Sequence, residues 1–301
     1  MSIAADKIAI VIPTVGRVDD LRKMLESLER QTRQPEQVVI IDEAGEGHAL
    51  AREFSRLNIA VTTFPGGSAS AKRNRGMELV APDIELIGFM DDDIVLEPAA
   101  VKAMMDFWKT AGADVAGAGC NWVNQDPLYA RRLKSLPVVS WLGLYDARGG
   151  RVMPSGFQTL IGVVSENRYV QWLSSIAVVY RRHLLAEHHF DEWYEGYSYL
   201  EDVDLSYALG RKYKLAVVAG ARFRHYPSSL GRPDTYLFGK KEVINRLHFV
   251  RKHPELSVGR CLLALGVRNL MSLYRAVTRL DKASFRRALG NLAAAFRSGA
   301  A

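Results

Sequence analysis

The sequence predicts an α/β fold, in which a Rossmann-like mixed sheet is flanked by helices and followed by a helical, basic C-terminal appendage. Three observations predict it. Short apolar runs alternate with segments of helical spacing over the first 111 residues, as in strands joined by helical crossovers. Several of these runs end in aspartates, and ligands of such sheets bind at the carboxyl ends of strands. Residues 240–301 hold 13 Lys or Arg against 3 Asp or Glu, whereas residues 1–239 have a net charge of −3.

The first half of the chain alternates strictly between the two kinds of element. The run KIAIVIPT at 7–14 predicts a strand, because Val and Ile favour pleated sheet and Pro13 closes the run. The next segment, 18–32, predicts a helix, because its apolar residues recur at helical spacing. The same reasoning predicts strands at 37–42, 58–65 and 85–90 and helices at 71–80 and 98–111.

The second half is less regular. Its pattern predicts a strand at 113–123, an apolar run at 171–182, a loop and helix within 183–213, and a last strand at 214–227. Residues 124–170 are rich in turn-forming and aromatic residues without a clear period. The order of elements there is not predicted.

Composition restricts the class of protein. The chain has 301 residues, of which 48% are hydrophobic and 24% charged, as expected for a globular domain with one large core. Its two cysteines, Cys120 and Cys261, are far apart and have no metal-ligand spacing, which favours a reducing compartment. No signal-like region opens the sequence, and no window of 18 uncharged apolar residues occurs. We expect a cytoplasmic protein without a membrane span.

The stretch FMDDDIVLEP, residues 89–98, places three carboxylates directly after an apolar run. Like charges this close repel, and burial would increase the free-energy cost. A divalent cation with its bound phosphates, Mn²⁺ or Mg²⁺, would offset that charge. A solvated acidic turn would explain the triplet equally simply.

Four landmarks in one order resemble a family 2 glycosyltransferase with the nucleotide-diphospho-sugar-binding (GT-A) fold. They are VIPTVGRVDDLRKMLESLERQT, VVIIDEAGEG, the helix SASAKRNRGMELV followed by FMDDD, and YLEDVDLSYALGRKY. The resemblance runs from about Ile8 to about residue 254. It implies a GT-A catalytic domain over 1–239, with a nucleotide-binding half at 1–120 and an acceptor half at 121–239, before a helical basic region at 240–301.

The resemblance also implies how the donor is bound. It makes Asp93 the direct metal ligand, places Asp91 toward the ribose or the metal, and gives Asp92 either role. Asp42 corresponds to the position that accepts hydrogen bonds from the base, which suits uracil or thymine. Without the resemblance, Asp42 could equally cap a helix or turn. Glu43 stands where the family often has a second Asp.

Further donor contacts are implied for three residues. Arg73 would reach the nucleotide or its phosphates, and Pro13 and Thr14 would place backbone against the base. The neighbouring Lys72 and Arg75 are expected to be surface cations.

Deprotonation of the attacking hydroxyl needs a base, and Asp202 is the candidate, with Glu201 as its rival. Both open a helix-like stretch, where acids also simply favour the N-terminal dipole. One positioned base without a second nucleophilic carboxylate implies direct displacement with inversion. Trp193, within a group of aromatic residues and acids, and Ser175, in the acceptor-side segment, are predicted to bind the acceptor.

His225, in RFRHYPSS, matches a position where many family members supply an imidazole metal ligand. A lone histidine is more often structural, and the chain has seven.

The C-terminal region predicts an amphipathic helix at 261–280, with Arg268, Arg275 and Arg279 on one face. Continuation past Asp281 would extend this basic stripe through Lys282 and Arg286. The stripe could be a solvated face of a helix packed on the body, or it could attach the protein peripherally to an anionic cytoplasmic leaflet. Since no nucleic-acid motif is recognised, nucleic acid is not an expected partner.

The function implied is a metal-dependent, inverting glycosyltransferase of cell-surface polysaccharide synthesis. It would move a hexosyl or deoxyhexosyl group from a UDP- or dTDP-sugar to a glycan or lipid-linked glycan. The alternatives are a catalytically inactive GT-A-fold binding or scaffold protein, and a sugar-nucleotide nucleotidyltransferase. The last would be expected to have a Gly-rich loop after the first strand, where PTVGRVDD has one Gly.

Overall fold

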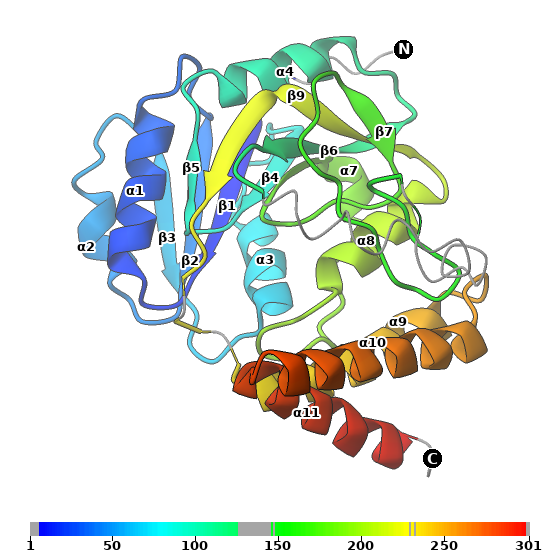
Figure 1. Cartoon of the computed structure of the whole chain (residues 1–301). Coiled ribbons are helices and arrows are strands. Elements are labelled where there is room, and N and C mark those ends of the chain that lie inside the picture. Colours follow the sequence, from blue (N-terminus) through cyan, green and yellow to red (C-terminus); the bar gives the residue numbers. More distant parts are fainter. Residues whose placement is uncertain (1–5, 126–145, 147, 229, 232, 299–301) are drawn as a thin grey trace. The chain divides into compact units, whose positions relative to one another are not determined.

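The chain forms two compact units in the computed structural model, which describes residues 6–125, 146, 148–228, 230–231 and 233–298. The first unit comprises Met1–Asp126 and Ile161–Gly231, and the second comprises Pro127–Leu160 and Arg232–Ala301. The first contains the sheet and its helices, and the second contains three long helices (Figure 1). The domain boundary expected between 239 and 240 remains a prediction. Helix α9 (Thr235–Lys252) runs across that position.

Within the described residues, nine strands form one mixed sheet, as predicted. Their order is β3-β2-β1-β4-β8-β6-β9-β5, with β7 paired to β9. The first four are parallel, whereas β8 runs antiparallel to β4 and β6. The strands are β1 (Ile8–Thr14), β2 (Gln37–Asp42), β3 (Ile59–Thr63), β4 (Leu86–Met90), β5 (Ile94–Leu96), β6 (Val115–Trp122), β7 (Arg168–Val170), β8 (Ala177–Arg181) and β9 (Lys214–His225).

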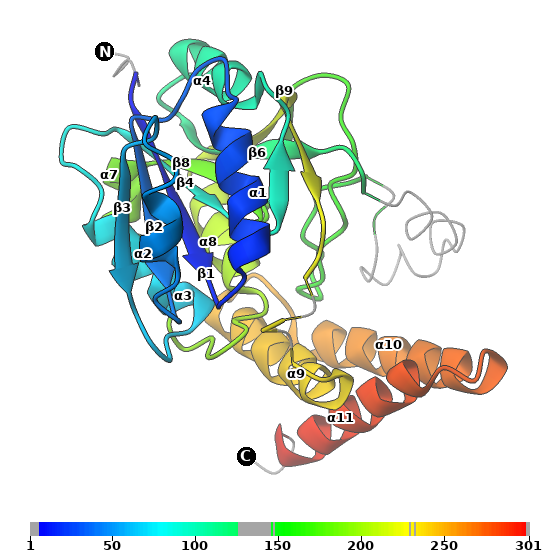
Figure 2. The same cartoon turned by 90° about the vertical axis from the view of Figure 1, so that its left-hand side faces the viewer.

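Helices cover both faces of this sheet (Figure 2). They are α1 (Val18–Glu29), α2 (Gly47–Ala51), α3 (Ala69–Glu78), α4 (Ala100–Thr110), α7 (Arg182–Leu185) and α8 (Glu201–Gly210). The predicted helices and strands of the first half all form. The short elements β5 and α2 were not predicted, because three to five residues are too few for a periodic pattern.

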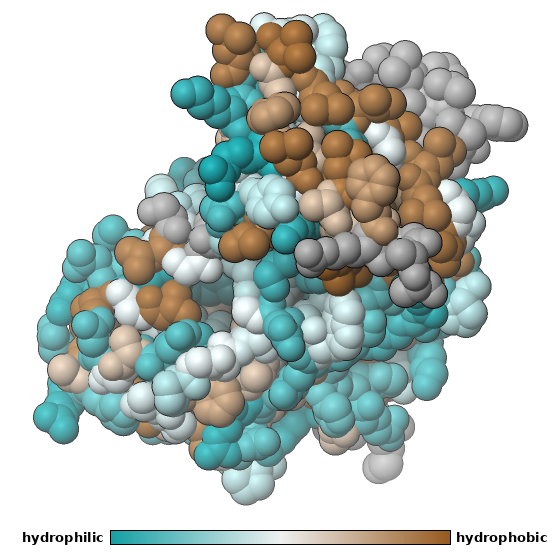
Figure 3. Space-filling model, turned by 90° about the horizontal axis from the view of Figure 1, so that it is seen from below, coloured by the Kyte–Doolittle hydropathy of each residue, from teal (hydrophilic) through white to brown (hydrophobic). Residues whose placement is uncertain are grey.

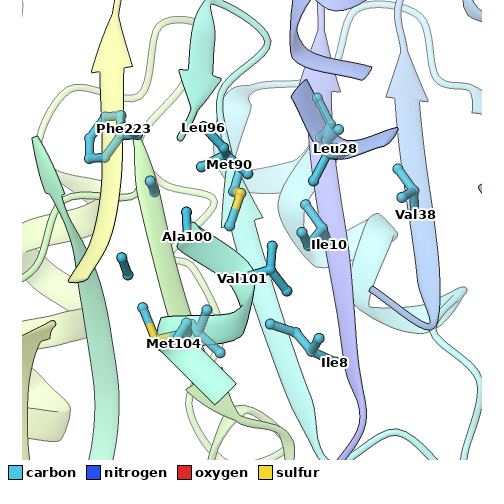
Figure 4. Packing of buried hydrophobic residues seen from close by; sticks show 14 of the residues in the cluster. Ile8, Ile10, Leu28, Val38, Met90, Leu96, Ala100, Val101, Met104 and Phe223 are labelled. Carbon is cyan, nitrogen blue, oxygen red and sulfur yellow. The ribbon is translucent and has the colours of Figure 1, made fainter. Parts of the chain in front are cut away.

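The core lies on both sides of the sheet because successive side chains of a strand point to opposite faces. In β1, Ile8, Ile10 and Ile12 join the cluster that α1 and α4 cover, whereas Ala9 and Val11 join the cluster that α3, α7 and α8 cover. Figure 4 shows the first cluster, in which side chains of α4 pack between β1 and β9. Burial on both faces explains why β1 is a continuous apolar run.

Strand β9 contains an irregularity. β6 advances by one residue, from Cys120 to Asn121, while its partner β9 advances by four, from Val218 to Arg222. The Asn121 amide donates to the carbonyl of Ala219 at 3.0 Å and holds the extra residues in place. Beyond them, buried and exposed side chains alternate strictly from residue 221 to residue 225.

The second unit contains α9, α10 (Val258–Thr278) and α11 (Lys282–Ser298). The predicted amphipathic helix forms as α10, which ends at Thr278 and does not continue past Asp281. Leu280 has a left-handed backbone (φ 51°), and the Asp281 carboxylate accepts from the N–H groups of Ala283 and Ser284 and so caps a new helix. Lys282 therefore belongs to α11 and does not extend the stripe of α10.

The basic face expected on α10 is also interrupted. Arg268 donates through Nε to Glu242 Oε1 at 2.5 Å, and Glu242 is fully buried. One of the three arginines of the predicted stripe therefore contacts a buried acid, although its side chain stays 43% exposed. No helix in the part of the chain that the structure describes is both long and apolar enough to cross a membrane.

Candidate functional site

The carboxyl ends of three neighbouring strands bring the predicted acids to one edge of the sheet. β1 lies between β2 and β4, parallel to both, and Thr14 is paired with Asp42. Asp91 directly follows the last residue of β4. Ligands of parallel sheets bind at such an edge, and the Asp triplet follows the carboxyl end of β4, which Figure 1 labels.

Asp92 is buried and holds the loop that leads from β1 into α1. Its carboxylate accepts hydrogen bonds from Thr14 Oγ1 at 2.6 Å and from Arg17 Nη1 at 2.9 Å. Burial raises the pKa of Asp92 to about 6, although Arg17 and Thr14 act in the opposite direction. The structure thus gives Asp92 a supporting contact. Its role toward nucleotide or metal remains a prediction.

Asp93 meets His225 because β5 and β9 pair antiparallel with His225 opposite Ile94. His225 Nε2 lies 3.0 Å from Asp93 Oδ1, and the Ser228 N–H donates to Asp93 Oδ2 at 3.0 Å. Burial raises the pKa of Asp93, but His225, Ser228 and Arg17 outweigh it, so the pKa lies below its usual value. Two of the three predicted metal ligands are therefore in contact.

Arg73 joins the Asp triplet to the second acidic motif. Its Nη2 donates to Asp91 Oδ1 at 3.0 Å and its Nη1 to Glu201 Oε1 at 2.8 Å. The guanidinium is buried, and its carbon lies 5.4 Å from the ring centroid of Phe190. Arg73 was predicted to reach the nucleotide, which remains a prediction. The structure shows it bridging two carboxylates that are far apart in the sequence.

The residues around Arg73 explain the motif in which it occurs. Ser68 caps α3 by accepting from the Ala71 N–H at 3.1 Å. Asn74 exchanges two hydrogen bonds with the backbone of Phe190, at 2.9 and 3.0 Å, and so ties α3 to the loop before α8. A Cβ at Gly76 would lie 2.2 Å from Val11 Cγ1, so only glycine lets α3 approach β1 this closely. Each residue supports the position of Arg73.

Glu201 and Asp202 begin α8 after a strained turn. Ser198 and Leu200 have left-handed backbones, with φ of 51° and 84°, and such values are uncommon for Leu. Strain of this kind is often found at functional sites. The Ser198 hydroxyl accepts from the Ser70 N–H at 3.3 Å, which fixes this turn against α3.

The two acids at the start of α8 differ in exposure and in contacts. Glu201 is buried against Arg73, and Asp202 is partly exposed. Burial raises the pKa of Glu201 to about 8, with a further contribution from Asp202 and an opposing one from Arg73. Burial also raises the pKa of Asp202, although hydrogen bonds from Val203, Ser174 and Ser175 oppose the rise. Asp202 is the acid that a ligand can reach.

Negative charge is in excess at this edge. Five carboxylates gather there, those of Asp91, Asp92, Asp93, Glu201 and Asp202. In the described parts of the chain, the arginines in contact with them are Arg17 and Arg73. Carboxylates crowded in this way either retain protons or require another cation.

A divalent cation fits this donor set. Asp93 Oδ1 faces His225 Nε2 at 3.0 Å, the buried His225 Nδ1 makes no hydrogen bond among the described residues, and Asp91 is partly exposed beside them. No three His, Cys, Asp or Glu side chains of residues 6–125, 146, 148–228, 230–231 and 233–298 converge as a ready metal cage. Mg²⁺ commonly takes one or two carboxylates and completes its shell with water and substrate phosphates.

The Asp42 carboxylate is held by backbone N–H groups, which is the turn-capping role given above as the alternative to base binding. Its Oδ1 accepts from the Ala44 N–H at 3.0 Å and its Oδ2 from the Gly47 N–H at 2.7 Å. The side chain is 1% exposed. Pro13 lies next to it, paired with Ile41. Contact of either residue with a base remains a prediction.

The two predicted acceptor residues have different environments. Trp193 is 46% exposed and stands edge-on to Tyr194, with ring centroids 5.6 Å apart. Ser175 is buried, and its backbone lies against Asp202. Trp193 is thus open to a ligand, and Ser175 supports the base candidate.

One expectation at the site was wrong and one residue was missed. Lys72 was expected at the surface, but it is buried and paired with Glu43, whereas Arg75 is at the surface as expected, with its side chain 41% exposed. Arg17, which contacts Asp92 and lies 3.6 Å from Asp93, was not predicted. The only signal was its place in the loop after the first strand, at the ligand-binding end of the sheet.

Comparisons with known proteins agree with this geometry. A family model for glycosyl transferase family 2 matches residues 9–165. An uncharacterized glycosyltransferase of Bacillus subtilis, YwdF, is 34% identical over 107 residues, 35% of this chain and 39% of that protein. Another of Escherichia coli, YibD, is 24% identical over 179 residues, 54% of this chain and 52% of that protein. The chain thus spans about half or less of the length of these relatives.

Two solved structures share the fold. The mannosyltransferase PcManGT of Pyrobaculum calidifontis, in complex with GDP-Man and Mn²⁺, has a TM-score of 0.57 and 12% identity, covering 95% of this chain and 87% of that chain. The S. aureus TarS fragment 1–349 has a TM-score of 0.53 and 16% identity, covering 81% of this chain and 65% of that chain. At such identities the likeness concerns the fold, here the GT-A type.

Proposed function

The chain belongs to glycosyl transferase family 2, and from this premise we propose that it is a metal-dependent, inverting glycosyltransferase. Its donor would be a UDP- or dTDP-linked hexose or deoxyhexose. Its acceptor would be a glycan or lipid-linked glycan in cell-surface polysaccharide synthesis. The observation that carries the proposal is the gathering of five carboxylates around two arginines at the carboxyl edge of the sheet.

Asp93, His225 and Asp91 are the residues that would hold Mn²⁺ or Mg²⁺. When bound, the ion would neutralise the diphosphate of the donor and of the leaving group. The position of His225 opposite Ile94 supports this assignment, because strand pairing brings an imidazole to Asp93. The Mn²⁺ complex of PcManGT concerns that enzyme and supports metal use only by analogy of fold.

For the donor, we propose that Thr14, Asp42 and Pro13 lie beside the base and that Arg73 reaches the ribose or phosphates. Arg73 is already charged and oriented by Asp91 and Glu201. A guanidinium fixed in this way would not need to be reordered when a phosphate arrives.

Asp202 would take the proton of the acceptor hydroxyl. It is the more exposed acid of the pair, and the Val203 N–H fixes one of its oxygens at 2.7 Å. Glu201 is bonded to Arg73 and would position that arginine. A single base on the acceptor side would permit attack opposite the leaving diphosphate, hence inversion.

The acceptor would stack on the exposed ring of Trp193, a residue that precedes α8 in the sequence. Aromatic rings bind sugars through their apolar faces. A lipid-linked acceptor would place the enzyme in the cytoplasm, peripherally at the cytoplasmic face of a membrane.

Metal-dependent nucleotide binding is the first expected result. In calorimetry, UDP or dTDP should bind in the presence of Mn²⁺, and Asp93→Ala should weaken that binding at least about tenfold, since it removes a ligand of the ion. GDP belongs in the panel because PcManGT binds GDP-Man. Asp106→Ala, which removes an exposed acid of α4, is the matched control and should bind as the unmodified chain does.

Failure of every nucleotide to bind, with or without metal, would contradict the proposal. The non-catalytic GT-A-fold interpretation would then stand. Melting curves of both variants show whether a loss of binding reflects a loss of fold.

A further inference from the structure

Helix α10 presents an apolar face to solvent. Leu262, Leu270, Tyr274 and Val277 recur at helical spacing, and the last three are 68%, 70% and 75% exposed. Surface helices of water-soluble proteins usually place such a stripe against the core. In α10 the stripe lies on the outside.

Helix α11 repeats the arrangement. Phe285, Leu289, Leu292 and Phe296 follow each other at intervals of four, three and four residues, and all are exposed, Phe296 to 79%. Figure 3 shows apolar side chains gathered in a broad patch on the helical unit. Contiguous apolar surface of this kind indicates an interaction site.

The interior of the helical unit contains a polar network as well as apolar side chains such as Leu247 and Phe249. Glu242 of α9 is fully buried and accepts hydrogen bonds from Arg268 of α10 and from Arg287 of α11, at 2.5 and 2.7 Å. Burial raises the pKa of Glu242, but these arginines outweigh it and lower the pKa to about 2. The group therefore stays ionised and fixes both helices to α9.

Small residues allow this close packing. A Cβ at Gly290 would lie 2.0 Å from the Tyr236 carbonyl oxygen, so α11 meets α9 backbone to backbone. Ala288 and Ala294 are buried on the same helix. Small residues and polar contacts of this kind join helices in a lipid environment, and here they occur beside a partly apolar interior.

Charge indicates which kind of partner covers the apolar face. Residues 240–301 have a net charge of +10, and Arg260, Arg279 and Lys282 are exposed on the two helices that carry the apolar side chains. A second copy of the chain would bring this charge against itself. An anionic bilayer attracts it.

We propose that α10 and α11 lie in the interface of an anionic bilayer, with their outward apolar side chains inserted between the lipids. Neither helix can span a membrane, so α10 and α11 would both lie in the plane of the interface. Binding combines burial of the apolar face with attraction between basic side chains and anionic headgroups. It does not depend on the donor, the metal or catalysis.

The test is co-sedimentation of the full chain with vesicles of phosphatidylcholine and phosphatidylglycerol at 3:1, and with pure phosphatidylcholine. We expect binding to the mixed vesicles and at least about tenfold weaker partitioning on the neutral ones. Leu270→Ser with Val277→Ser should lower partitioning about tenfold or more, since two inserted side chains are lost. Both positions are exposed, so the fold should persist.

The matched control is Val163→Ser with Tyr169→Ser, which removes two exposed apolar side chains of the sheet unit and should leave partitioning unchanged within about twofold. The proposal is overturned when the full chain ignores the mixed vesicles, or when the Leu270 and Val277 variant binds like the control. A second copy would cover the face instead if three results were found together. Light scattering would show a dimer, the Leu270 and Val277 variant would be monomeric, and the full chain would not bind vesicles. Nucleotide calorimetry is unaffected by any of these outcomes, so failure here and failure of the proposed function are distinct.

Discussion

Replacing Asp202 by asparagine is expected to lower kcat by about 10²–10⁴ while leaving donor binding nearly unchanged. The amide keeps the shape of the side chain and can still accept the Val203 N–H, but it cannot take a proton. Burial raises the pKa of Asp202, and only the ionised carboxylate can act as the base. The rate of the unmodified enzyme should therefore rise with pH, and the midpoint of that rise should lie above the usual pKa of aspartate. Steady-state kinetics over a pH series, with acceptor-dependent release of the nucleoside diphosphate as the readout, would measure both effects.

Glu201→Gln separates the two acids at the start of α8. A glutamine can still accept the hydrogen bond from Arg73, so we expect a loss of less than about tenfold in kcat and retention of the pH limb. If Glu201→Gln instead abolished turnover and Asp202→Asn did not, the base would be Glu201. Equal tolerance of both substitutions would refute a carboxylate base on α8.

Replacing Arg73 by methionine is expected to destabilise the protein by about 3–5 kcal/mol, because the buried Glu201 and the partly exposed Asp91 lose their shared cation. Arg73 is buried and bonded to Asp91 and Glu201 at 3.0 and 2.8 Å. Urea denaturation would measure the free energy of unfolding. Arg73→Lys should recover part of it, because a lysine keeps the charge without the planar fork.

Arg75→Met is the matched control for this change. Arg75 lies two residues further along α3, is partly exposed and pairs with Glu78, so its loss should change stability by no more than about 0.5 kcal/mol. Adding Glu201→Gln to Arg73→Met should restore stability in part, because one uncompensated carboxylate is removed. Equal effects of Arg73→Met and Arg75→Met would show that the bridge contributes nothing.

Most of the sheet could be predicted from the sequence because its strands are buried on both faces and its helices are strongly periodic. The runs at 7–14, 37–42 and 85–90 became β1, β2 and β4. Such patterns are local, so a single sequence contains them. β5 escaped prediction because it spans three residues and forms through pairing with β9, more than a hundred residues away.

The site could be predicted at the level of motifs but not of contacts. The Asp triplet, Arg73, Glu201 and Asp202 do come together, as the shared motifs implied. Which acid meets which cation depends on tertiary packing, and no local pattern reports it. The sequence therefore could not predict that Arg17 would pair with Asp92.

Helix α10 shows a different limit of sequence patterns. Its amphipathic spacing was visible, but a period does not say which face turns inward. Arg268 contacts the buried Glu242, whereas Arg279 is exposed. Packing against α9 sets which part of the stripe meets solvent, and the choice between a solvated and a membrane-facing stripe remains a prediction.

The irregular stretch 219–221 of β9 has a consequence for how this protein can change. Because strand side chains alternate, the number of residues in that stretch sets whether His225 or Arg224 points inward beside Asp93. Removing Gly220 while residues 214–218 kept their places against β6 would shift β9 by one residue against β5 and turn the imidazole outward, although no site residue had been substituted. Surface segments commonly tolerate insertions and deletions, but a change of one residue in this segment would exchange the inward and outward faces of the strand that follows.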